Sequence, residues 1–181
     1  SVLGLAIGAG LAFLIEFIRL PYEEPDTFNI IDRETGAYNK SYFTLRLSQE
    51  LNRARRNKYP LSLGLFKVEF EGEDISQREQ IEAMQVFKKL TENSIREDDI
   101  LARVNGDIFA VLLPYVKNDK ADELLSRMKQ EFTSLAQEIL SNNGGGQVLS
   151  YSSVVTYQGG FIDEARLLQK GINALEAANA Y

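Results

Sequence analysis

A short charged stretch near the middle of the chain has the residue types and spacing to bind a charged ligand. Residues 96–99 read Arg-Glu-Asp-Asp, and Asn105-Gly106 begins six residues after Asp99. An arginine fork can engage phosphate oxygens or the edge of a purine ring, and a carboxylate can accept from ring N–H groups. Arg96 and Asp99 are therefore candidate ligand contacts. In the alternative, structural interpretation, Asp99 orients the following hairpin and Arg96 closes a helix.

A second candidate is Asp107, which directly follows the Asn105-Gly106 dipeptide. This dipeptide stands between two apolar runs, residues 100–104 and 108–113. Asn-Gly between strand-like runs predicts a β-hairpin, because both residues tolerate a positive φ. Asp107 would then lie at the hairpin tip, either as a ligand for substrate or metal or as an ordinary turn residue.

The composition restricts which chemistry these residues can take part in. The 181-residue chain contains no Cys and no His, which removes thiol nucleophiles, imidazole bases and the usual zinc ligands. A metal site would need carboxylate and carbonyl oxygens, a donor set that suits magnesium. The net charge is −6 and there is no long basic run, so we expect no nucleic-acid partner.

Apolar periodicity predicts the elements that position these residues. Helical spacing marks residues 41–57, 78–95, 118–140 and 163–178, and strand patterns mark residues 61–70 and 148–157 in addition to the hairpin. The resulting order is α-β-α-β-β-α-β-α. This order predicts an α/β fold with a mixed central sheet and helices on both faces.

The N-terminal segment differs from the rest of the chain. Residues 2–15 carry no charge, and an ideal helix of about 20 residues is long enough to cross a bilayer. Gly4 and Gly8 have a spacing that lets two membrane helices approach closely. We predict a transmembrane helix at residues 1–20, a proline-bracketed linker at 21–27 and a domain at 28–181. The alternative for the first segment is a buried or coiled soluble helix.

Three blocks of residues within this domain carry a family resemblance. Residues 32–43 read D-R-E-T-G-A-Y-N-K-S-Y-F, residues 103–109 read R-V-N-G-D-I-F, and residues 171–178 read G-I-N-A-L-E-A-A. In order and spacing they are similar to the motifs D-x-L-T-G-L-x-N-R-R-x-F, R-x-G-G-D-E-F and A-D-x-A-L-Y-x-A-K of the GGDEF family, the diguanylate cyclase domains. The resemblance implies a nucleotidyl-cyclase-like fold.

Active members of that family join two GTP molecules into cyclic di-GMP with the help of divalent metal ions. Relative to the family pattern, Lys67 stands at the position of the metal-binding Asp, Ile108 replaces the Glu of the turn, and Asn179 replaces the terminal-helix Lys. The family's guanine-contacting N-D-x-x-G-H-x-x-G-D stretch has no counterpart between residues 71 and 85. We therefore expect no catalytic residues, no metal site and no enzyme activity.

The turn block, residues 105–109, departs from the family pattern at some positions and keeps it at others. Asn105 replaces the first Gly, while Gly106, Asp107 and Phe109 keep their family positions beside Ile108. A divergent enzyme that binds GTP through Asp107 and metal through Glu69 is an alternative. It would require a two-residue shift of the strand and a compensating bulge.

The family resemblance also gives Arg96 and Asp99 a specific role. Many members carry an R-x-x-D motif at this spacing before the turn, and this I-site binds cyclic di-GMP. The resemblance implies cyclic di-GMP as a regulatory ligand held by Arg96 and Asp99, with no other cofactor.

Residues 4–17 are similar to the last membrane helix of polysaccharide chain-length determinant proteins. This resemblance implies a homo-oligomer in the bacterial inner membrane, with the GGDEF-like domain in the cytoplasm and polysaccharide synthesis or export proteins as partners. The leading hypothesis is a catalytically inactive, membrane-tethered cyclic-di-GMP receptor that regulates exopolysaccharide synthesis or export. The alternative is a nucleotide-independent dimerisation or partner-docking module.

Overall fold

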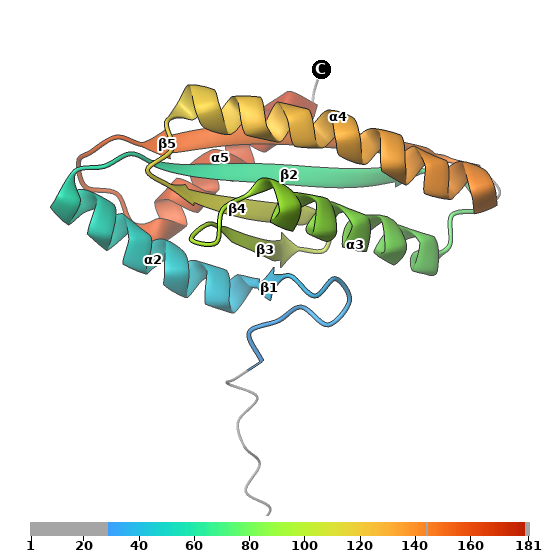
Figure 1. The fold of residues 1–181 in the computed structure, drawn as a ribbon, viewed down its shortest axis with the longest axis horizontal. Coiled ribbons are helices and arrows are strands. Elements are labelled where there is room, and N and C mark those ends of the chain that lie inside the picture. Colours follow the sequence, from blue (N-terminus) through green and yellow to red (C-terminus); the bar gives the residue numbers. More distant parts are fainter. Residues whose placement is uncertain (1–28, 144, 180–181) are drawn as a thin grey trace, which may run out of the picture.

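A mixed five-stranded sheet forms the centre of the fold, with strand order β1-β3-β4-β2-β5 (Figure 1). The computed structural model describes residues 29–143 and 145–179. β1 runs parallel to β3, and every other neighbouring pair is antiparallel. The strands are β1 (Tyr38–Asn39), β2 (Leu61–Glu71), β3 (Ile100–Asn105), β4 (Ile108–Pro114) and β5 (Gln147–Tyr157).

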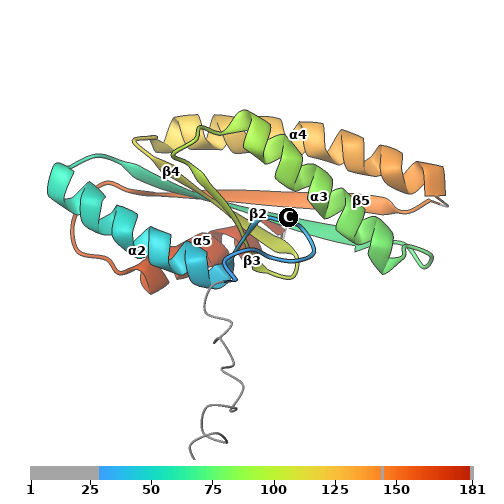
Figure 2. The same cartoon turned by 60° about the horizontal axis from the view of Figure 1, so that its bottom comes forward.

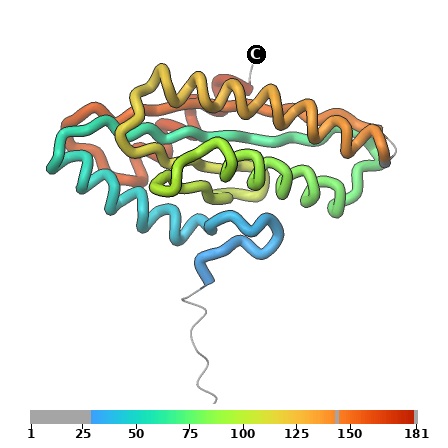
Figure 3. Tube along the Cα trace, in the orientation of Figure 1, coloured from blue at the N-terminus to red at the C-terminus, as the bar shows by residue number. Residues whose placement is uncertain are grey.

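Two helices pack on each face of the sheet. Figure 2 shows these layers after a 60° turn of the molecule, and Figure 3 traces the chain. The helices are α2 (Lys40–Asn57), α3 (Gln77–Ser94), α4 (Asn118–Asn143) and α5 (Glu164–Asn179). One core layer lies between the sheet and α3 and α4, and the other lies between the sheet and α2 and α5. The predicted α/β fold with a mixed sheet is therefore confirmed.

β2 contributes to both core layers because its side chains alternate between the two faces. Leu63 and Leu65 pack in the layer of α2 and α5, whereas Phe66 and Val68 pack in the layer of α3 and α4. Burial on both faces explains why the strand reads as a nearly continuous apolar run rather than an alternating one.

Local signals fix where the helices begin. The Asn39 side chain accepts a hydrogen bond from the backbone N–H of Tyr42 and caps α2. Ser76 and Glu79 form a reciprocal capping box at the start of α3. α2 ends at Lys58, which adopts a left-handed conformation with φ 56°.

The hairpin forms where it was predicted, but its turn differs from the expectation. Neither Asn105 nor Gly106 has a positive φ among the described residues. Instead the pairing of β3 with β4 shifts register between Arg103 and Asn105. The chain itself reverses at Gly106 and Asp107, between the paired residues Asn105 and Ile108, so the turn lies one residue later than Asn105-Gly106 predicts.

The predicted transmembrane helix at residues 1–20 and the linker at 21–27 lie outside the described residues. Of the helices within residues 29–143 and 145–179, none is long and apolar enough to cross a membrane.

Candidate functional site

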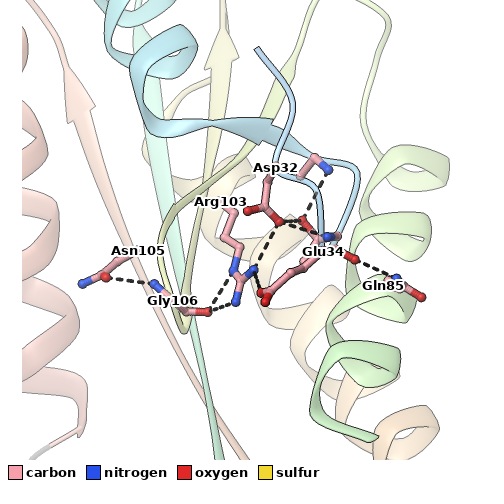
Figure 4. Close-up of polar contacts among 8 residues, drawn as sticks. Asp32, Glu34, Gln85, Arg103, Asn105 and Gly106 are labelled. Carbon is pink, nitrogen blue, oxygen red and sulfur yellow. Dashed lines mark hydrogen bonds and ion pairs between the residues drawn. The ribbon is translucent and has the colours of Figure 1, made fainter. Parts of the chain in front are cut away.

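Arg103 joins two of the sequence blocks that lie far apart in the chain (Figure 4). Its Nη1 donates to Asp32 Oδ1 at 3.2 Å and also to the carboxylate of Glu34. Its Nε and Nη2 donate to the carbonyl oxygen of Gly106 at 2.9 and 2.7 Å. The loop before β1 and the tip of the β3–β4 hairpin are therefore held together by a single guanidinium.

Asp32 is committed to the structure of its own loop. Its Oδ1 accepts from the backbone N–H of Thr35 at 2.9 Å and from the Thr35 hydroxyl at 2.7 Å. Burial raises the pKa of Asp32, but the hydrogen bonds from Thr35 and the contact with Arg103 outweigh it, so the net pKa lies below its usual value. The Oδ1 atom of Asp32 is thus fully engaged within the protein, by Thr35 and by Arg103.

Lys67 lies on β2 beside the hairpin tip, at the position that resembles the family's metal-binding Asp. Its ammonium contacts the carboxylate of Glu69 and lies 3.9 Å from Asp107 Oδ2. The hydrogen bond with Glu69 raises the pKa of Lys67, and the negative charges of Glu69 and Asp107 add to this effect against the opposing effect of burial. A fixed positive charge therefore lies between the two carboxylates.

Asn179 and Asp107, two further candidate positions, also make hydrogen bonds within the protein. Asn179 Nδ2 donates to Glu69 Oε1 at 3.4 Å, and the backbone carbonyl of Asp107 accepts from the N–H of Val68 at 2.9 Å. β2 pairs residue for residue with β5 from Leu61 to Glu71. Within residues 29–143 and 145–179, no cluster of three or more carboxylates is arranged to hold a metal ion.

Beyond the tip, the turn block enters the hydrophobic core. Ile108 is partly buried against the layer of α2 and α5, and Phe109 is fully buried on the other face. The Phe109 ring lies 4.8 Å from that of Phe87. Asn105 stays at the surface, where its Oδ1 accepts from the N–H of Gly106. Of the turn residues 105–109, only Asp107 has a carboxylate side chain.

Arg96 and Asp99 are brought together, but their two side chains are not equally accessible. Asp99 Oδ2 accepts from the backbone N–H of Arg96 at 2.8 Å, and Asp99 Oδ1 accepts from Arg96 Nη2 at 3.1 Å. Arg96 Nη2 also donates to the carbonyl of Pro114 at 2.7 Å. The Arg96 side chain is 58% exposed and the Asp99 side chain 3%. Asp99 closes the turn, whereas Arg96 keeps an open face.

A cleft of about 460 Å³ adjoins this open face. Ile31, Tyr38 and Leu101 supply apolar and aromatic surface, and the charged lining consists of Arg96 together with the carboxylates of Glu92, Glu97 and Asp99. The cleft combines a guanidinium donor with carboxylate acceptors on a concave wall, an arrangement suited to a planar ligand that has both hydrogen-bond acceptors and donors.

Comparison with known families gives a match in the region that contains the turn and the terminal helix. The family "Diguanylate cyclase, GGDEF domain" matches residues 81–180, just over half of the 181-residue chain. The chain belongs to the GGDEF family. Comparison with curated protein sequences gives no match.

Solved GGDEF structures share this fold at low sequence identity. The GGDEF domain of FimX from Pseudomonas aeruginosa superposes with a TM-score of 0.69 at 18% identity, covering 83% of this chain and 94% of that one. The GGDEF domain of DgcB from Caulobacter crescentus, in complex with cyclic di-GMP, gives 0.71 at 13% identity, covering 83% and 90%. The diguanylate cyclase SiaD from P. aeruginosa, in complex with its activator SiaC, gives 0.70 at 19%, covering 99% and 73%.

Sequence reasoning missed part of this GGDEF domain's polar surface. The role of Arg103 as a tie between Asp32 and Gly106 depends on its contact with Asp32, 71 residues away in the chain, which spacing does not reveal. Glu92, which also lines the Arg96 cleft, lies four residues before Arg96. Helical spacing could not predict this proximity, because α3 ends at Ser94 and Arg96 lies beyond the helix.

Proposed function

We propose that this GGDEF domain makes no cyclic di-GMP and instead acts as a cyclic-di-GMP receptor through Arg96 and Asp99. In this proposal residues 1–20 tether the chain to the bacterial inner membrane, and ligand binding in the cytoplasm regulates exopolysaccharide synthesis or export. The observation that carries the inactive assignment is the Lys67 ammonium between Glu69 and Asp107.

The charge of Lys67 opposes the chemistry of a cyclase. Phosphoryl transfer depends on divalent cations that neutralise the triphosphate and the charge that develops on it. A divalent cation beside Asp107 would meet the Lys67 ammonium, whose contact with Glu69 keeps it protonated. Ile108 offers no replacement ligand, because its side chain is apolar and packs against the core.

The receptor assignment depends on the open face of Arg96. Its guanidinium is held by Asp99 and Pro114, which reduces the rotamer entropy lost when a ligand binds. In the proposed complex, Arg96 donates to a phosphate or to the guanine edge, and Asp99 accepts from guanine N–H groups after turning outward. The cyclic-di-GMP complex of the similar DgcB domain supports this ligand class.

Titration calorimetry of the 181-residue chain with cyclic di-GMP tests the proposal. We expect saturable micromolar binding that Arg96→Ala weakens at least roughly tenfold, because a charge-assisted donor contributes about 1.5–3 kcal/mol. Arg78→Ala is the matched control, since Arg78 is exposed on α3, away from the cleft, and its removal should leave binding unchanged.

Two results would reject parts of this proposal separately. The receptor role fails if there is no heat of binding at micromolar ligand or if the affinity of Arg96→Ala is unchanged. Magnesium-dependent turnover of GTP that disappears in Asp107→Ala would contradict the inactive assignment and favour a divergent enzyme.

A nucleotide-independent docking module is the second candidate. The observation that favours it is the burial of the Asp99 carboxylate, whose hydrogen bonds to Arg96 already give it a structural role. This function would be identified by two results together: the chain captures a polysaccharide assembly protein equally well with and without cyclic di-GMP, and calorimetry shows no binding of cyclic di-GMP.

A further inference from the structure

A second and larger cleft lies where α2 ends and β5 leads into α5. These segments are on the left in Figures 1 and 2. Its volume is about 750 Å³. It shares no lining residue with the Arg96 cleft. Its walls carry three cations and three aromatic rings, from Arg55, Lys58, Lys117, Tyr59, Tyr157 and Phe161.

The charge of this cleft contrasts with that of the whole chain. None of the residues that line it in the described part of the chain is an Asp or Glu, although the chain has a net charge of −6. The nearby carboxylate of Glu50 is already engaged by the Tyr59 hydroxyl at 3.1 Å and by Arg53 at 3.0 Å. The cleft is therefore a local positive site, and an anion is the complementary ligand.

Arg55 is held as a planar cation against an aromatic ring. Its guanidinium carbon lies 4.8 Å from the centroid of the Phe161 ring. Its Nη2 donates to the carbonyl of Ile162 at 3.1 Å and its Nη1 to Asn52 Oδ1 at 3.2 Å. The Nε of Arg55 is buried without a hydrogen-bond partner among the described residues. The guanidinium thus has donor capacity that the protein does not use.

The loop between β5 and α5 holds Phe161 at the surface. Gly159 and Gly160 have φ values of 130° and 83°, a region that favours glycine. The Tyr157 hydroxyl donates to the carbonyl of Gly160 at 2.8 Å and anchors the loop. Phe161 is nevertheless 86% exposed. An exposed ring on an anchored loop provides a stacking surface for a planar ligand.

We propose that this cleft binds a nucleoside monophosphate, with its base stacked on Phe161 and its phosphate among Lys58, Lys117 and Arg55. The volume lies within the range of roughly 300–1,000 Å³ that is typical of small-molecule sites. Stacking tolerates any base because every base has a π face, whereas the cations require the phosphate. The proposal is independent of the receptor function, because it uses none of the residues around Arg96.

Calorimetry of the 181-residue chain with three probes tests the two halves of this ligand. The probes are AMP, adenosine and ribose 5-phosphate. We expect AMP to bind at least roughly tenfold more tightly than either half, because only AMP engages both the ring and the cations. Phe161→Ala should weaken AMP binding roughly tenfold and adenosine binding similarly, while leaving ribose 5-phosphate binding unchanged.

Lys58→Asn removes a cation, and Asn tolerates the left-handed backbone conformation at this position. The variant should therefore weaken the binding of AMP and of ribose 5-phosphate but not the binding of adenosine. Lys89→Ala, an exposed lysine on α3, and Arg96→Ala are the matched controls and should bind AMP like the wild type. The proposal is overturned if AMP does not bind at about millimolar concentration, if AMP binds no better than adenosine, or if both site variants bind AMP unchanged. Circular dichroism checks that each variant is folded.

Discussion

Glu50 shows how a single buried charge is accommodated in this domain. The residue lies on α2 and is 4% exposed. Arg53 donates to its Oε1 and the Tyr59 hydroxyl donates to its Oε2, so both carboxylate oxygens have partners. Burial raises the pKa of Tyr59 to about 12, and the charge of Glu50 together with this hydrogen bond contributes to the shift. Tyr59 therefore remains a neutral donor at physiological pH.

Tyr59→Phe should destabilise the domain at neutral pH by about 1–2 kcal/mol, because one oxygen of a buried carboxylate loses its donor. The pH dependence has a definite sign. An unfolded Tyr loses its proton near pH 10, whereas folded Tyr59 retains its proton up to about pH 12. The stabilisation is thus complete below pH 10 and is lost between about pH 10 and 12, by about 2–3 kcal/mol.

Urea unfolding of the wild type and Tyr59→Phe across this alkaline range measures the effect. The wild type should lose more stability than the variant between pH 10 and 12. Tyr115→Phe is the control, since the Tyr115 ring stacks on Tyr59 but its hydroxyl does not contact Glu50. Parallel alkaline profiles for wild type and Tyr59→Phe would contradict the assignment.

At the scale of single residues, the sequence was sufficient to predict features that depend only on which amino acid occupies a position. The substitutions Lys67, Ile108 and Asn179 stood out against the family pattern without any coordinates. The contacts of these residues could not be predicted from the sequence. Lys67 on β2 contacts Asp107 at the hairpin tip, and Asn179 on the last helix contacts Glu69. The inaccessibility of the Asp99 side chain was equally hidden, since spacing gives no information about burial.

At the scale of secondary-structure elements, the contact between β2 and α4 depends on one glycine, Gly64. Gly64 lies on β2 beneath Leu125 of α4, which is fully buried. A Cβ at position 64 would lie 2.7 and 2.8 Å from the two Leu125 methyl carbons. These distances are far below van der Waals contact, and Leu125 cannot withdraw without moving its neighbours.

Gly64→Ala should therefore lower the free energy of unfolding by about 1–3 kcal/mol, the usual range for overpacking a core. Gly106→Ala is the matched control, because a Cβ there meets nothing within 4 Å and its φ is not positive. The control should stay within about 0.5 kcal/mol of the wild type. Chemical denaturation measures both, and equal midpoints for the two variants would argue against this packing.

The elements were largely predictable because their periodicity is strong. Four helices and four longer strands occur in the predicted order, with ends displaced by a few residues. β1 was missed, since a strand of two residues has no periodicity to detect. On α4, predicted at residues 118–140, the apolar Leu135 is exposed, and Ala136 and Leu140 take the buried positions nearby. Small residues on a helix face give a weak apolar signal, although they allow close packing.

The whole molecule has two core layers on one shared sheet, so we expect the layers to unfold together. Tyr59 and Tyr157 are buried in the layer of α2 and α5, whereas the opposite layer contains the packed rings of Phe66, Phe87 and Phe132. β2 supplies side chains to both layers, and this coupling predicts a single cooperative transition.

Near-ultraviolet circular dichroism of the tyrosines and far-ultraviolet dichroism of the helices should give one midpoint. Gly64→Ala provides the sharper measurement, because it disturbs the layer of α4 while the buried Tyr59 and Tyr157 report on the other layer. Both signals should shift equally. A tyrosine signal that stays at the wild-type midpoint would mean that the two faces unfold independently.

The position of β2 between β4 and β5 has a consequence for the chain during its synthesis. Leu61 pairs with Tyr157, so one side of β2 has no partner until most of the domain has been made. During that interval an 11-residue, mostly apolar strand has an unpaired edge, the kind of surface that pairs with other chains. Pairing β2 with β5 also requires the long stretch of chain between them to close into a loop, and such non-local pairing is slow. A nascent chain that ends before β5 is therefore the form of this protein most exposed to aggregation.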